Sequence, residues 1–153
     1  MFTNILLPVD GSEASLRAAG HGIQLAATLS ATVTVLTVTT PWAAYFSREL
    51  AVVIPEVVIP QGEYDYKREA IAACILHNVA SDARTAGLNV KALHRSHRDP
   101  CRAIIDTAMA EGCDLIIMGS HCDRSFGGNL LGSETMKVMT HTTIPVLVYR
   151  DND

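Results

Sequence analysis

Short apolar runs alternate along this chain with longer segments whose apolar residues recur at helical spacing. The runs are ILLPV, VTVLTV, LIIM and VLVY, within Asn4–Asp10, Thr32–Val38, Leu115–Gly119 and Pro145–Arg150. Such continuous runs are typical of strands buried on both faces, as in parallel sheets covered by helices. A more polar strand is expected over Asn89–Arg95. The alternation predicts an α/β fold with a single doubly wound five-stranded parallel sheet and helices on both faces.

Four connecting segments carry signals for the start or end of a helix. Ser12 can cap the first helix, Gly87 can follow a second over Tyr66–Ala86, and Asp99-Pro100 can open a third. A fourth is expected over Ser133–His141. The face of the second helix that should be buried comprises Ile71, Ile75, Val79 and Ala83.

The run DLIIMGSHCDRSFGGNLLGSET leaves an apolar strand at Gly119 and enters a helix only after Gly132-Ser133. Glycines let backbone N–H groups approach an anion closely, and a helix N-terminus adds the positive end of its dipole. This layout indicates a phosphate-binding loop, with a plain strand-to-helix connection as the alternative. If the first and fourth strands are neighbours, Asp10 and Gly119 line one crevice at the carboxyl end of the sheet, where doubly wound folds bind ligands.

The chain has 153 residues and a formal net charge of −4. It fits one domain spanning residues 1–153, long enough to bury a core without disulfide or metal support. No basic run suggests a nucleic-acid surface. The start, MFTNILLPVD, has neither the basic region nor the long apolar stretch of a signal peptide, and no apolar run is long enough to cross a bilayer. We therefore expect a cytoplasmic protein that binds neither nucleic acid nor membrane.

The four cysteines and six histidines show no CxxC pair and no zinc-ligand spacing. Reduced thiols are therefore expected, and no metal site is predicted. Cys74 and Cys113 stand in apolar stretches and should be core residues. Cys101 would lie in the first turn of a helix, where the dipole can lower a thiol pKa, so it is either a packing residue or a reactive one.

The segment from Pro41 to Asp65 breaks the alternation of strands and helices. Pro55, Pro60 and Gly62 discourage a single regular element, yet WAAYF and LAVVIPEVVI are too apolar for a solvated linker. Long connections inside a compact domain are typical of lids, binding loops and interfaces. We expect an apolar flap over residues 41–65 that packs on the domain or its partner, with disorder as the alternative.

Three stretches together resemble the universal stress protein family: NILLPVDGS at the start, GSHC with GS ten residues after it, and the closing TIPVLVYR. The resemblance covers nearly the whole chain. Family members that bind ATP carry G-x2-G-x9-G-[S/T] after the fourth strand. Here Gly119 and Gly132-Ser133 keep that spacing, and Cys122 stands where the second glycine belongs. The resemblance implies a Rossmann-like stress-response domain that binds ATP or a related adenine nucleotide.

The resemblance also implies roles around the base and the ribose. Asp10 would accept hydrogen bonds from the adenine edge or the ribose, with a turn or helix-cap role as the alternative. Apolar surface on both sides of the base would come from Pro8, Val9 and Val38. Other residues would approach the ribose or open the loop: Met118, Gly119, Ser120, His121 and Cys122.

The start of the fourth helix would hold the phosphates. Backbone N–H groups and hydroxyls would come from Gly132, Ser133, Glu134 and Thr135. A simple helix cap is the alternative for Ser133. The Glu134 carboxylate would oppose a triphosphate unless a metal ion such as Mg²⁺ intervenes.

No catalytic set is recognisable, because the chain has no P-loop lysine, no supported triad and no paired carboxylates. A nucleotide-binding sensor is therefore the first hypothesis, with slow ATP hydrolysis through Asp10 and a metal ion, or a nucleotide-free dimeric scaffold, as alternatives. In the expected strand order 3-2-1-4-5, Pro145–Arg150 is an apolar edge that needs a cover. The resemblance implies a homodimer through this fifth strand, and coverage by the flap is the alternative.

Overall fold

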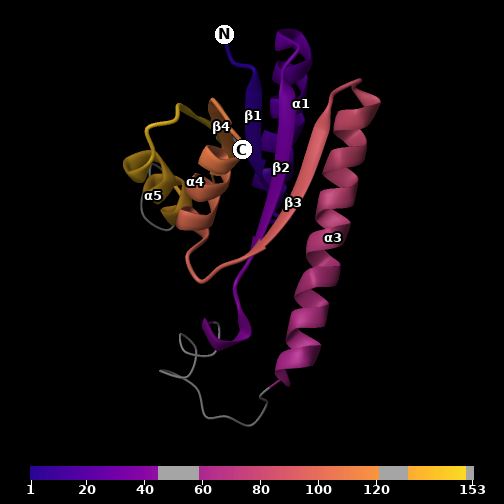
Figure 1. Cartoon of the computed structure of the whole chain (residues 1–153), viewed down its shortest axis with the longest axis vertical. Coiled ribbons are helices and arrows are strands. Elements are labelled where there is room, and N and C mark those ends of the chain that lie inside the picture. The colour runs from indigo at the N-terminus through magenta and orange to yellow at the C-terminus, as the bar shows by residue number, and fades with distance from the viewer. Residues whose placement is uncertain (45–58, 121–130, 151–153) are drawn as a thin grey trace.

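The computed structural model describes residues 1–44, 59–120 and 131–150. Five strands form one parallel sheet in the order β3-β2-β1-β4-β5, as predicted (Figure 1). The order reverses between β1 and β4, which pair through Ile5 with Leu115 and Leu6 with Ile116. The strand bounds are β1 Asn4–Pro8, β2 Thr32–Thr39, β3 Val90–Ser96, β4 Leu115–Ser120 and β5 Val146–Arg150.

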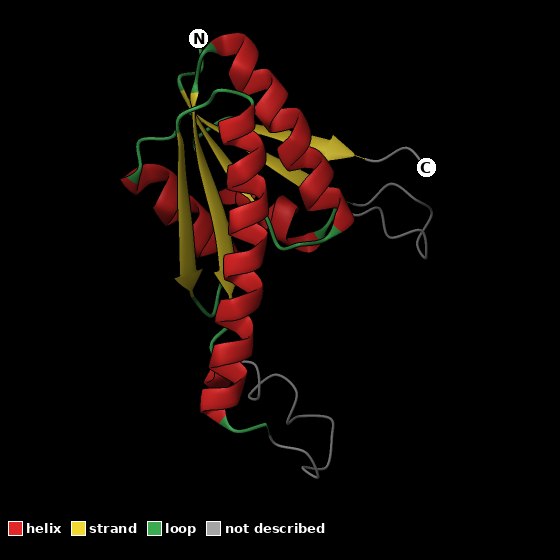
Figure 2. Cartoon of the chain, turned by 90° about the vertical axis from the view of Figure 1, so that its right-hand side faces the viewer, coloured by secondary structure: helices red, strands yellow, loops and turns green. Residues whose placement is uncertain are grey.

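Helices cover both faces of the sheet (Figures 1 and 2). On one face, α1 and α3 enclose a core that includes Ile5, Leu7 and Val35. On the other, α4 and α5 enclose a core that includes Leu6, Leu36 and Ile116. Neighbouring strand residues thus point into opposite cores, which explains the continuous apolar runs. The helix bounds are α1 Glu13–Leu29, α3 Gln61–Thr85, α4 Pro100–Ala110 and α5 Ser133–His141.

The predicted helix signals hold at three places. The Ser12 side chain accepts a hydrogen bond from the backbone N–H of Ser15, 3.3 Å away, and so caps α1. Asp99 caps α4 with Pro100 in its first turn. Gly87 follows α3 with a φ of +79°.

Three predictions about α3 are wrong, namely where the helix begins, the burial of Ile71 and the burial of Cys74, whereas the predicted burial of Val79 and Ala83 is confirmed. The helix begins directly after Pro60, at Gln61 rather than Tyr66. Proline has no backbone N–H, but this costs no hydrogen bond at the start of a helix, where the N–H groups have no partner within the helix. Its buried face contains Ala72, Leu76, Val79 and Ala83, whereas Ile71 is 55% exposed. Cys74, which was predicted as a core residue, is exposed because it does not lie on this buried face of α3.

The two described ends of the 41–65 segment are fastened together. The indole N–H of Trp42 donates to the carbonyl of Ile59 at 2.9 Å, and the Tyr64 hydroxyl donates to the carbonyl of Thr40 at 3.0 Å. Residues 45–58, on which most of the predicted flap falls, lie outside the described residues. None of the helices that are described is long and apolar enough to cross a membrane.

Candidate functional site

A cavity of about 340 Å³ opens where the carboxyl ends of β1 and β4 meet the starts of α1, α4 and α5. This is the point at which the strand order reverses, where ligands of doubly wound sheets bind. Most of the predicted site residues line it: Pro8, Val9, Asp10, Val38, Met118, Gly119, Gly132, Ser133, Glu134 and Thr135. Residues separated by more than a hundred positions are thus brought to one crevice. His121 and Cys122 lie outside the described residues.

Asp10 stands at the mouth of this crevice in a tight turn. Its Oδ1 accepts a hydrogen bond from the backbone N–H of Ser12 at 2.9 Å, and Gly11 between them has a φ of +84°. A Cβ at Gly11 would be strained at that φ. Asp10 therefore forms the turn considered as its alternative role, and the same turn places its exposed carboxylate in the cavity wall.

Gly119 is required by the approach of β4 to the first turn of α1. A Cβ at this position would lie 2.3 Å from the carbonyl oxygen of Ala14 and 2.8 Å from the nitrogen of Ser15. Both are backbone atoms that cannot turn aside. Glycine here lets β4 and α1 pack closely enough to form one side of the crevice.

Two side-chain hydrogen bonds connect the end of β4 to the start of α5. The Ser120 hydroxyl, in a residue only 2% exposed, accepts from the backbone N–H of Gly132 at 2.8 Å. The Thr135 hydroxyl donates to the carbonyl of Gly119 at 3.3 Å. Ser120 does not line the cavity, so its direct role is to position α5.

The helix-cap alternative for Ser133 is wrong. Gly132 occupies the cap position of α5, and no side chain caps this helix. Ser133 is exposed in the first turn and lines the cavity. The N–H groups of a first helical turn have no partners within the helix, which makes them suitable donors for an anion.

The cavity also has walls that sequence reasoning missed: Ser12, Ser15, Leu36, Pro100 and Ile104. Leu36 could have been found, because residues two apart in a strand share a face and Val38 was identified. Ser12 was identified only as a cap. The start of α4 approaches the crevice through tertiary packing, for which the sequence has no local signal.

Burial and charge make Cys101 a packing residue. It is 6% exposed beside Pro100, and burial raises the pKa of its thiol, with further contributions from the negative charges of Asp99 and Glu134. The reactive alternative for Cys101 is therefore not supported. Among the residues that the structure describes, no three His, Cys, Asp or Glu side chains gather to hold a metal ion.

The fold and the crevice at its reversal point define a Rossmann-like α/β protein with a ligand site at the carboxyl end of the sheet. Residues 1–150 match the model of the universal stress protein family, and the chain belongs to that family. It is similar to the universal stress protein YxiE of Bacillus subtilis, with 28% identity over 98% of this chain and 100% of the relative.

Solved structures with the same fold agree with this assignment. The structure of hypothetical protein MJ0577 is 27% identical, covers 100% of this chain and 99% of its own, and superposes with a TM-score of 0.79. A universal stress protein in complex with cAMP is 22% identical, with 97% of each chain covered and a TM-score of 0.69. The second likeness shows the fold alone.

Proposed function

We propose that this chain binds an adenine nucleotide, ATP or a related one, in the crevice between β1 and β4 and acts as a stress-response sensor. The observation that carries the proposal is the convergence of the predicted base, ribose and phosphate residues on one cavity at the reversal point. Its volume of about 340 Å³ lies within the range of roughly 300–1,000 Å³ that is typical of small-molecule sites.

The residues present fit such a ligand. Val9, Leu36 and Met118 are buried apolar residues in the wall, which suit the faces of a purine. Asp10 offers a carboxylate to the base edge or the ribose hydroxyls. The first turn of α5 presents backbone N–H groups to a phosphate. The similar protein in complex with cAMP supports an adenine ligand for this fold.

Titration calorimetry with AMP and with ATP, each with and without Mg²⁺, tests the proposal. Asp10→Ala should weaken binding about tenfold or more, because a hydrogen bond to a charged group contributes roughly 1.5–3 kcal/mol. Asp82→Ala, the same change on the exposed face of α3, is the matched control and should leave affinity unchanged. Absence of saturable heat and of a thermal shift at millimolar nucleotide would refute the proposal.

A binding module, a slow ATPase and a nucleotide-free scaffold make different predictions in two measurements. Mass spectrometry of ligand released from freshly purified protein separates the scaffold from the other two. Release of ADP and phosphate over hours of incubation with ATP and Mg²⁺ separates the ATPase from the sensor.

We further propose a homodimer through β5. Within the described sheet β5 pairs only with β4, and it ends the strand order. Leu147 on this edge is 42% exposed, and Val146 and Val148 are only half-buried. An apolar edge strand is a template for pairing with a second copy about a two-fold axis.

Sedimentation equilibrium of wild type and Leu147→Glu tests the dimer. The two introduced carboxylates would approach each other across the axis, so dissociation should become at least about tenfold easier, a change of roughly 1.4 kcal/mol. Ala92→Glu on β3, the opposite edge, should leave the dimer intact. A monomeric wild type would exclude the interface.

A further inference from the structure

Glu134 places a carboxylate in the wall of the crevice at the helix start where phosphates would lie. It is the second residue of α5 and lines the cavity together with Gly132 and Ser133. Its negative charge also helps to raise the pKa of the Cys101 thiol on α4. The carboxylate therefore makes the region between α4 and α5 more negative.

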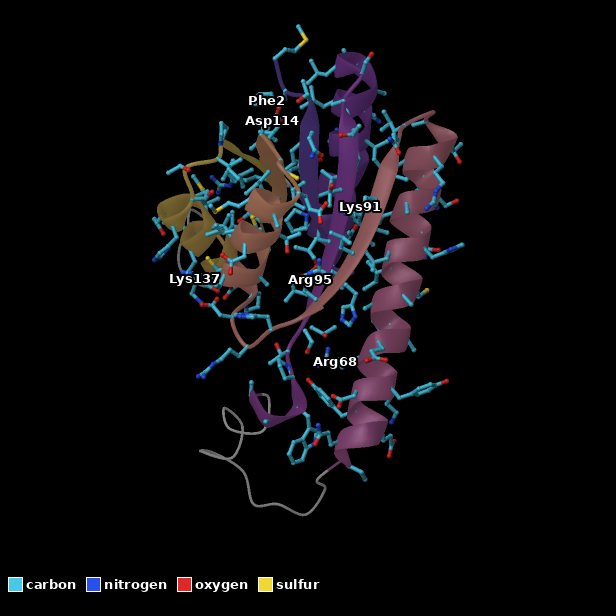
Figure 3. All side chains as sticks on the ribbon, in the orientation of Figure 1. Phe2, Arg68, Lys91, Arg95, Asp114 and Lys137 are labelled. Carbon is cyan, nitrogen blue, oxygen red and sulfur yellow. The ribbon has the colours of Figure 1, made fainter. Side chains whose placement is uncertain are left out.

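The charge of Glu134 is only partly compensated. Its Oε1 lies 2.8 Å from the Lys137 ammonium nitrogen, but both side chains are partly exposed, and such pairs on one helix interact weakly. Its Oε2 is buried and has no hydrogen-bond partner among the described residues. A buried acceptor of this kind is stabilised by a donor such as a hydroxyl, not by another anion. Figure 3 shows Lys137 on α5.

Several groups that would otherwise receive a phosphate already have protein partners. The Gly132 N–H donates to Ser120, and the Thr135 hydroxyl donates to the carbonyl of Gly119. Among the described residues of the cavity wall, Asp10 and Glu134 are charged and no Lys or Arg is present. The helix N-terminus contributes only about half a positive charge against these two carboxylates.

We infer that the crevice selects adenine ligands with at most one phosphate, a nucleoside or a monophosphate, over the triphosphate, and that Glu134 sets this selection. The inference rests on the proposed function and narrows it. One phosphate can take the remaining N–H groups of α5, and the ribose hydroxyls can donate to carboxylates. Each further phosphate adds negative charge next to Glu134, and the described residues of the wall include no cation to balance it.

Calorimetry with adenosine, AMP and ATP in EDTA tests the selection on wild type and Glu134→Gln. Wild type should bind AMP at least about tenfold more tightly than ATP, because like charges a few ångströms apart in a partly buried site repel strongly. Glu134→Gln keeps the shape of the side chain, so ATP affinity should rise about tenfold while adenosine affinity stays equal or falls.

Glu13→Gln is the matched control. Glu13 also lies in the first turn of a helix and also pairs with a cation on its own helix, Arg17, but it is not part of the cavity wall. It should leave the AMP-to-ATP preference unchanged. If Glu134→Gln folds poorly, the salt dependence of the wild-type preference replaces it, because screening should narrow the gap between AMP and ATP.

The outcomes separate the two proposals. If no adenine ligand binds wild type, the proposed function fails and this inference fails with it. If wild type binds ATP as tightly as AMP, the selection is refuted and the proposed function stands. An equal effect of Glu134→Gln on adenosine, AMP and ATP would show that Glu134 shapes the site without reading phosphate charge.

Discussion

At the amino ends of β1 and β4 both carboxylate oxygens of Asp114 have donors from the protein itself. Its Oδ2 accepts from the backbone N–H and the hydroxyl of Thr3, each at 2.8 Å, and its Oδ1 accepts from the N–H of Asn4 at 3.0 Å. Figure 3 shows Asp114 near Phe2, at this end of the sheet. At the carboxyl ends of the same strands, Glu134 Oε2 has no such donor within the described chain.

The hydrogen bonds to Asp114 change its pKa as well as its position. Partial burial by itself raises the pKa of Asp114, but the hydrogen bonds from Asn4 and Thr3 outweigh it and leave the pKa below its ordinary value. Those bonds fasten the start of the chain to the start of β4. The carboxyl end instead contains an open cavity with acceptors in its wall. The Asp114 carboxylate therefore stabilises the fold through donors from the protein, whereas Glu134 Oε2 contributes a buried negative charge beside the cavity that no described donor satisfies.

Gly119→Ala should have the largest effect, because Gly119 both allows β4 to pack against α1 and lines the cavity. The new Cβ would collide with the backbone of Ala14 and push β4 away from α1, which should lower the free energy of unfolding by about 3 kcal/mol and abolish nucleotide binding. Urea denaturation and calorimetry measure the two effects.

Gly62→Ala is the control for that substitution. Gly62 lies in the first turn of α3, where nothing lies within 4 Å of the added Cβ, so the change should be neutral or stabilise by up to about 1 kcal/mol. Equal destabilisation by both substitutions would show that the contact with Ala14 is not the reason for glycine at position 119.

Ser120→Ala should have an intermediate effect. It tests the comparison of the two ends, because Ser120 lies at the carboxyl end of β4 and yet makes a hydrogen bond that stabilises the fold. Ser120 was predicted as a ligand residue, yet its hydroxyl accepts from Gly132 N–H and is buried. Its loss leaves that N–H unsatisfied, which should cost about 1–2 kcal/mol of stability and weaken AMP more than adenosine as α5 shifts.

Ser96→Ala, at the exposed end of β3, is the control and should change neither quantity. If Ser120→Ala weakens binding at unchanged stability, Ser120 contacts the ligand directly, and its assigned role in positioning α5 is wrong.

The sequence predicted the sheet well because its central strands β1, β2 and β4 are buried on both faces and therefore appear as largely apolar runs such as LIIM. Topology predicted that Asp10 and Gly119 would line one crevice, because a parallel sheet brings every strand's carboxyl end to one edge. The other predicted wall residues came from the family resemblance. The order β3-β2-β1-β4-β5 and the pairing of β1 with β4 were assumed and are confirmed by the structure, since alternation alone leaves the neighbours open.

What the sequence left out depends on packing between distant elements. Pro100 and Ile104 enter the wall only because α4 leans on the crevice, and Ile71 is exposed because the alanines of α3, including Ala72 and Ala83, face the sheet instead. The 2.3 Å approach to Ala14 that makes Gly119 necessary is likewise invisible before the chain folds.

Asp114→Asn should have the smallest effect and sharpens the comparison, because it should act on stability without touching the ligand. An amide retains one oxygen and would place an NH₂ group against a donor, so stability at pH 7 should fall by about 1 kcal/mol, a value reduced by partial exposure. A carboxyl whose folded-state pKa is depressed stabilises the fold above its unfolded pKa of about 4, and this contribution disappears as the pH falls through the folded value. Urea melts at several pH values from 7 to 2 should therefore show the stability difference between wild type and Asp114→Asn disappearing below about pH 4.

Affinity for AMP at pH 7 should be equal in both proteins. A gap independent of pH would mean that the Asp114 charge contributes nothing at the amino end, and a loss of AMP affinity would mean that the two ends of these strands are coupled.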